Sequence, residues 1–72
     1  MYDDGQQVMV GDIVRRGGEE GEILKVEPNG LGGQENALIQ WSGIHEIAPG
    51  IRGRKAPVQD LTKGLRLVRR KL

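Results

Sequence analysis

Two short β-branched segments joined by a glycine-rich loop constrain the fold of this chain most strongly. The segment Val10–Arg16 places a Gly-Asp turn before isoleucine and valine, and Gly21–Val26 carries three aliphatic residues after the loop 17–20. Such runs, separated by a few residues that include glycine, predict a β-hairpin. Twelve glycines in 72 residues also argue against a helical bundle, because each costs about 1 kcal/mol in a helix interior. An all-β domain is therefore predicted.

The remaining strands are predicted from the positions of β-branched residues and turn residues. Pro28, followed by an Asn-Gly pair, is expected to end the second strand, because proline cannot donate to the ladder and Asn-Gly favours a tight turn. Residues 37–41 form the third strand, with side chains on alternating faces. A fourth strand is expected near 56–58 and a last one near 65–68, with a single 3₁₀ turn near 59–61 between them.

These elements predict a single five-stranded barrel with three regions along the chain. Residues 1–7 are expected to be a flexible N-terminus, residues 8–69 the barrel domain and residues 70–72 a basic C-terminal end. Residues 42–56 are expected to form a long mobile loop, because glycine and proline exclude a long helix there. The predicted core consists of Ile13, Ile23, Val26, Ile39, Trp41, Val58 and Leu67.

The composition narrows the classes of function. The chain has no cysteine, which excludes disulfides and thiolate metal sites within it. No run approaches the roughly 20 apolar residues that span a bilayer, so no membrane association is expected. The acidic start Met1–Asp4 has no apolar signal segment, which predicts a cytoplasmic location.

Candidate catalytic and ligand-binding motifs are weak in this sequence. The loop 17–21 is rich in glycine but acidic, and it has no Lys or Ser/Thr at P-loop spacing. His45 is the only histidine, and Ser42, three residues before it, has no nucleophile-elbow motif and no orienting acid. Tyr2 and Trp41 are the only aromatic residues, too few for a methyl-lysine cage or a proline-peptide groove. No cofactor, metal site or enzyme activity is predicted.

Charge is unevenly distributed along the chain. Residues 1–36 hold eight acidic and three basic residues, whereas residues 37–72 hold eight basic and two acidic residues. A cluster of arginines could neutralise several phosphates of a nucleic acid, or could simply keep the chain soluble and its edge strand unpaired. Exposed isoleucines in the 42–56 loop, Ile51 included, could instead meet a protein partner. The candidate binding residues are Arg15, Arg16, Trp41, Ile44, Ile47, Arg52, Arg54, Lys55, Arg66 and Arg69.

The order of motifs resembles an SH3-like small barrel. The opening is similar to the KOW motif of ribosomal and transcription-factor proteins, to Tudor-type repeats, and to short uncharacterised bacterial and phage proteins that begin Met-Tyr-Asp-Asp-Gly. The resemblance is carried by Val10–Val14, Gly21-x-Ile23, Leu38–Trp41, Pro57-Val58-x-x-Leu61 and Leu65-x-Leu67-Val68. It implies a five-stranded barrel, a fold that several unrelated functions share.

Three functions are compatible with this resemblance. The first is a small non-catalytic interaction module that binds a protein partner. The alternative is weak, sequence-independent binding to nucleic acid or to the ribosome through the arginines. The third is an enzyme similar to plasmid-type dihydrofolate reductase, which shares the Gly-Asp-x-Val opening. That enzyme builds its pore from a Val-Gln-Ile-Tyr strand, and the corresponding segment here is Arg54–Val58, so catalysis is not expected.

Overall fold

The computed structural model describes residues 1–70, apart from the side chains of Asn29, Leu31, His45 and Ile47. Residues 1–70 contain strands, turns and bends but no helix, and therefore no helix that could cross a membrane. The all-β prediction is confirmed. The strands are β1 (Ile13–Arg16), β2 (Glu19–Leu31), β3 (Gln34–Trp41), β4 (Ile44–Ala48), β5 (Ile51–Arg54), β6 (Val58–Leu61) and β7 (Arg66–Arg69).

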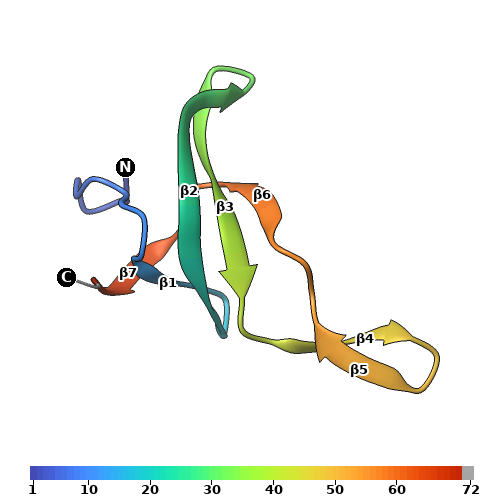
Figure 1. The fold of residues 1–72 in the computed structure, drawn as a ribbon. Helices are drawn as coiled ribbons and strands as arrows, with labels where there is room; N and C mark the ends of the chain where they lie inside the picture. The colour runs from blue at the N-terminus through green and yellow to red at the C-terminus, as the bar shows by residue number, and fades with distance from the viewer. Residues whose placement is uncertain (71–72) are drawn as a thin grey trace.

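Five of the strands form one antiparallel sheet in the order β6-β3-β2-β1-β7, and β4 and β5 form a separate two-stranded sheet (Figure 1). The predicted first hairpin is confirmed, because β1 pairs with β2 from Ile13↔Glu22 to Arg16↔Glu19. The prediction of a closed barrel is wrong. The short bend 62–65 carries the chain from β6, which pairs only with β3, to β7, which pairs only with β1. β6 and β7 therefore remain the two edges of an open sheet.

The side chain of Arg16 links β1 to β6, two strands of the sheet that are not paired through their backbones. The Arg16 guanidinium donates hydrogen bonds to the carbonyl oxygens of Leu61 and Lys63, at 2.7 and 2.8 Å, and forms an ion pair with Asp60. Arg16 comes from the end of β1, and its partners lie in β6 and directly after it. We name this contact the Arg16 clasp. It connects β1 to an edge strand with which β1 shares no ladder.

Two segments predicted as irregular are extended strands. Residues 59–61, predicted as a 3₁₀ turn, belong to β6, which pairs with β3 from Ile39↔Val58 to Asn36↔Leu61. The predicted loop 42–56 contains the β4–β5 hairpin, which turns at Pro49-Gly50 between the paired residues Ala48 and Ile51. Gly50 has a φ of 76°, which suits glycine after proline in a two-residue turn. The proline and glycine that exclude a helix here mark a hairpin turn.

The predicted end of the second strand at Pro28 is also wrong. β2 continues to Leu31, and the chain turns at Gly32-Gly33, whose φ values of 60° and 79° suit a two-residue hairpin turn. The register between β2 and β3 is irregular from Glu27 to Leu31. Pro28 lies inside this irregularity, where a missing backbone donor is tolerated.

The core lies on one face of the curled sheet. The alternation predicted for β3 is confirmed, because Ala37, Ile39 and Trp41 are buried while the residues between them are partly exposed. Of the predicted core, Ile13, Ile23, Ile39 and Trp41 are buried, and Val26 and Leu67 are partly buried. Val58 is 38% exposed because it lies on the edge strand β6 with no further strand beyond it. The buried residues that the sequence did not indicate include Tyr2, Val8, Val14 and Leu65.

Gly21 is expected to be essential for the packing of Trp41. A Cβ atom at Gly21 would lie 2.7 Å from Ile39 Cγ2 and 2.8 Å from Trp41 Cε3. Overpacking of this kind typically costs about 1–3 kcal/mol, so Gly21→Ala should lower the melting temperature markedly. Gly18→Ala is the matched control, because nothing lies within 4 Å of that position. Equal thermal melts for the two variants would contradict the packing of Trp41 against β2.

Candidate interaction site

The β4–β5 hairpin projects from the sheet on the side away from the N-terminus (Figure 1). Its two strands contact mainly each other, and neither has more than minor contact with another strand. Ile44 is 71% exposed and Ile51 is 56% exposed. An isolated two-stranded hairpin is at best marginally stable in water. The hairpin therefore presents large apolar side chains on an element with little support from its own domain.

The register of the hairpin sorts its side chains onto two faces. Ile44 pairs with Arg54, and Glu46 pairs with Arg52. Because side chains alternate along a strand, these four residues share one face, and Ile51 lies on the other. Ile47 falls at the irregularity between Glu46 and Ala48, and its side chain is outside the described residues. One face of the hairpin thus combines an apolar side chain with two arginines and one acid.

Hydrogen bonds fix the base of the hairpin to the main sheet. The backbone N–H and the hydroxyl of Ser42 both donate to the carbonyl oxygen of Glu20, at 2.9 and 2.8 Å. The next N–H, of Gly43, donates to the Glu19 carboxylate at 3.0 Å. Directly after β5, the carbonyl oxygen of Lys55 accepts a hydrogen bond from the side-chain amide of Gln40 at 2.9 Å. The hairpin is therefore attached at its base and exposed beyond it.

Several of the basic side chains are already neutralised by acids. Arg15 forms an ion pair with Glu20 at 2.9 Å, and Arg16 forms one with Asp60 at 2.8 Å. Arg70 is bound to the buried Asp12. The structure does bring Arg15 beside the last strand, because it pairs with Arg66 across β1 and β7. Its charge is nevertheless balanced by Glu20.

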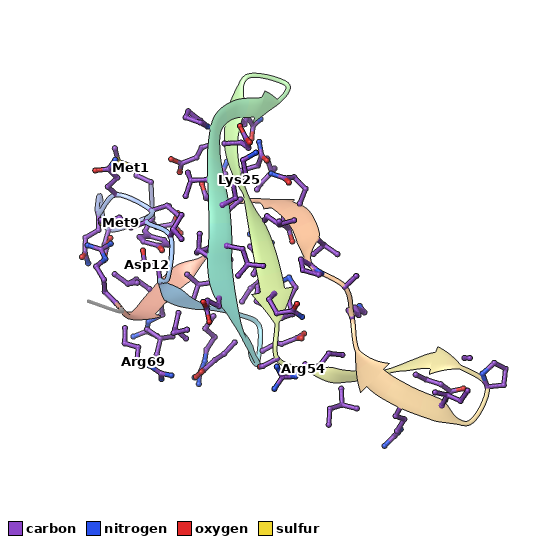
Figure 2. The ribbon with its side chains drawn as sticks, viewed as in Figure 1. Met1, Met9, Asp12, Lys25, Arg54 and Arg69 are labelled. Atoms are coloured by element: carbon purple, nitrogen blue, oxygen red, sulfur yellow. The ribbon has the colours of Figure 1, made fainter. Side chains whose placement is uncertain are left out.

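Two of the remaining arginines meet at one hollow. Arg54 from β5 and Arg69 from β7 line an open hollow of about 180 Å³, together with Glu20, Glu22 and Gln40. Figure 2 shows Arg54 where the hairpin meets the sheet and Arg69 beside β7. Among residues 1–70 we find no ion-pair partner for either guanidinium. The arginines from the predicted loop and from the last strand therefore come together at one place, next to two acids.

Trp41 belongs to the core and has little exposed surface. The residue is 8% exposed. It lines a hollow of about 250 Å³ with Arg16, Glu19, Lys55, Val58 and Asp60. Trp41 therefore leaves little of its surface open to a ligand.

A buried polar network that was not predicted surrounds Asp12, which lies where the N-terminal segment enters β1 (Figure 2). The Asp12 carboxylate accepts hydrogen bonds from the Tyr2 hydroxyl at 2.6 Å, from the Met9 N–H at 3.0 Å and from Arg70 Nε at 2.8 Å. Burial raises the pKa of Asp12, but the hydrogen bonds from Arg70 and Tyr2 outweigh burial and hold that pKa below its ordinary value. Burial and the neighbouring Asp12 raise the pKa of the Tyr2 hydroxyl. We name these three side chains the Asp12 network.

Comparison with known proteins gives no family for the chain. No protein-family model, no curated protein and no solved structure matches it. Among the described side chains, no three His, Cys, Asp or Glu residues lie together as metal ligands would. A small all-β domain with a five-stranded antiparallel sheet is compatible with an SH3-like fold.

Proposed function

We propose that this chain is a small non-catalytic interaction module that binds a protein partner through the β4–β5 hairpin. The observation that carries the proposal is the exposure of Ile44 and Ile51 on an element that projects from the sheet. Apolar side chains exposed on both faces of a protruding element favour association, because a partner that covers either face removes apolar surface from water. A bound partner would also supply the support that two strands lack by themselves.

The charges on the hairpin narrow the chemistry of the partner. Arg52 and Arg54 lie on the same face as Ile44, and Glu46 is the one acid among them. A complementary surface would therefore combine an apolar centre with acidic groups at its rim. Such charge complementarity contributes mainly to specificity and to the rate of association.

Capture of partners from cells that encode the chain tests this function. The immobilised wild type should retain a protein that the double variant Ile44→Glu/Ile51→Glu loses. Val10→Glu is the matched control, because Val10 is 64% exposed and lies outside the hairpin. Retention of the same protein by all three chains would contradict binding through the hairpin.

Nucleic-acid binding is the second candidate, supported by the hollow that Arg54 and Arg69 line together. Titration with short single-stranded DNA or RNA should then shift the amide signals near these arginines and leave those near Asp3 and Asp4 unchanged. The affinity should fall steeply between about 50 and 200 mM salt, because binding releases counterions. No shift at about 50 mM salt would remove this candidate.

A further inference from the structure

The outer edge of β7 is an open strand edge. β7 pairs with β1 on one side, and it is the last strand in the order of the sheet. In the part of the chain that the structure describes, no backbone hydrogen bond reaches the outer side of β7. The opposite edge is different, because the Arg16 clasp occupies the carbonyl oxygen of Leu61 at the end of β6. Alternate N–H and C=O groups of β7 are therefore available to another strand.

The side chains of β7 divide into a charged face and an apolar face. Arg66 pairs with Arg15, and Arg69 pairs with Ile13. The register between β1 and β7 shifts by one residue between these pairs, so both β7 arginines lie on one face although they are three residues apart. Leu67 pairs with the fully buried Val14, so it lies on the core face. Within residues 1–70, neither Arg66 nor Arg69 forms an ion pair. The edge thus offers two uncompensated cations on one face and an apolar side chain on the other.

Two hollows flank this edge. The larger, of about 420 Å³, is lined by Tyr2, Leu65 and Leu67, with Asp3, Asp4 and Arg66 among its other residues. The smaller, of about 280 Å³, is lined by Arg15, Arg66, Leu67 and Val68. Both hollows therefore include Arg66 and Leu67 of the edge strand. Because Asp3 and Asp4 line the larger hollow, it suits an apolar side chain better than an acidic one.

We propose that β7 binds an extended acidic segment of a partner protein, which pairs with it as a sixth strand. Main-chain hydrogen bonds to an exposed edge supply affinity in such complexes, and pockets for alternate side chains supply specificity. A strand that alternates acidic and apolar residues would place carboxylates near Arg66 and Arg69 and an apolar side chain beside Leu67. The surface is separate from the β4–β5 hairpin, so the proposal does not depend on the function proposed above.

The charges of β7 disfavour a second copy of the chain as the occupant. Antiparallel pairing of two β7 strands would bring Arg66 and Arg69 of each copy close to those of the other on a shared face. Like charges on neighbouring strands are destabilising. The arginines that oppose self-association at this edge attract an acidic strand.

Peptide titration followed by amide NMR tests the proposal. The probes are a blocked decapeptide of alternating Glu and Val, and the same peptide with Lys in place of Glu. The acidic peptide should shift the amides of β7 and β1, and it should bind at least about tenfold more tightly than the basic one, as several favourable cross-strand charge pairs would give. Equal affinities, or shifts that appear only in the β4–β5 hairpin, would overturn the proposal.

Charge reversal on β7 gives a second test. Arg66→Glu/Arg69→Glu should lower the affinity for the acidic peptide at least about tenfold and raise the affinity for the basic peptide. The fold should be retained, because Glu at position 66 would face Arg15. Lys25→Glu/Lys63→Glu makes the same change in net charge at two exposed positions outside β7 and the β4–β5 hairpin, and it should leave the affinity unchanged. An equal loss in both variants would show attraction to the overall charge and contradict binding at β7.

The main-chain hydrogen bonds can be tested directly. Acidic peptides that are N-methylated at every second residue, in either of the two phases, lose opposite sets of backbone donors. One phase should abolish binding, because its methyl groups face β7. Binding of both phases with the affinity of the unmodified peptide would show contact through side chains alone and overturn strand addition. Binding of single-stranded DNA at β7 without binding of the acidic peptide would equally overturn it.

Discussion

Asp12→Ala is expected to lower the free energy of unfolding by about 3–5 kcal/mol, because the buried carboxylate accepts several hydrogen bonds and each hydrogen bond to a charged group contributes about 1.5–3 kcal/mol. The substitution would leave the Arg70 guanidinium and the Tyr2 hydroxyl without the acceptor that both use. Urea denaturation followed by fluorescence of Trp41, the only tryptophan, measures the change. So large a loss could unfold a domain of this size.

Asp3→Ala is the matched control, because Asp3 is exposed and, within residues 1–70, accepts only a long 3.5 Å hydrogen bond from the Gly64 N–H. If Asp12→Ala does not fold, the free energy of unfolding of Arg70→Met measures the contribution of the Asp12 network instead. Stabilities of Asp12→Ala and Asp3→Ala that agree within error would show that the Asp12 network does not stabilise the fold.

The Asp12 network also predicts a dependence of stability on pH. The pKa of Asp12 lies below its ordinary value in the folded chain. The ionised carboxylate therefore stabilises the fold above the ordinary pKa of aspartate, and this stabilisation is lost as the pH falls through the lowered pKa. Asp12→Asn should reduce the loss of stability in acid. Some loss should remain, because hydrogen bonds from Thr62 and the Met1 amine, which outweigh burial, also hold the pKa of Glu35 below its ordinary value.

Ile39→Ala is expected to cost about 2–5 kcal/mol, the usual range for truncating a fully buried isoleucine. Ile39 has no exposed surface and pairs with Ile23 on one side and Val58 on the other. Val58→Ala is the matched control, because it changes the neighbouring position in the same row of the sheet on a partly exposed edge strand. Thermal melts should show a much smaller change for Val58→Ala. A larger effect at Val58 than at Ile39 would contradict the position of the core.

Local patterns predicted the parts of the fold that depend on neighbouring residues. The hairpin of β1 and β2 and the alternating burial of β3 follow from signals a few residues apart. The prediction of the turn after the second strand was wrong. The sequence contains two pairs that favour a tight turn, Asn29-Gly30 and Gly32-Gly33, and the chain turns at the second pair. Pro49 and Gly50 exclude a helix, which predicts a loop. A Pro-Gly pair between two apolar segments also fits a hairpin turn, and the chain forms that turn.

The candidate sites were harder to predict because they depend on distant parts of the chain. Arg70 meets Asp12 across 58 positions, and Arg16 meets Leu61 across 45. No local pattern distinguishes an arginine that will be buried in such a bond from one that stays free on β7. The sequence predicts exposed isoleucines in residues 42–56 that could meet a partner, because they lie among turn residues. The open edge at β7 follows only from the order of the strands.

The Arg16 clasp has a consequence for the seam between β1 and β6. Backbone ladders hold β6 to β3 and β7 to β1. From β1 to β6 and to Lys63 just beyond it, the hydrogen bonds and the ion pair that we find among residues 1–70 come from one guanidinium with three oxygen partners. Separating that seam requires a side chain to change rotamer, a much faster event than the parting of two paired strands. The clasp can therefore open and close while every backbone ladder stays intact.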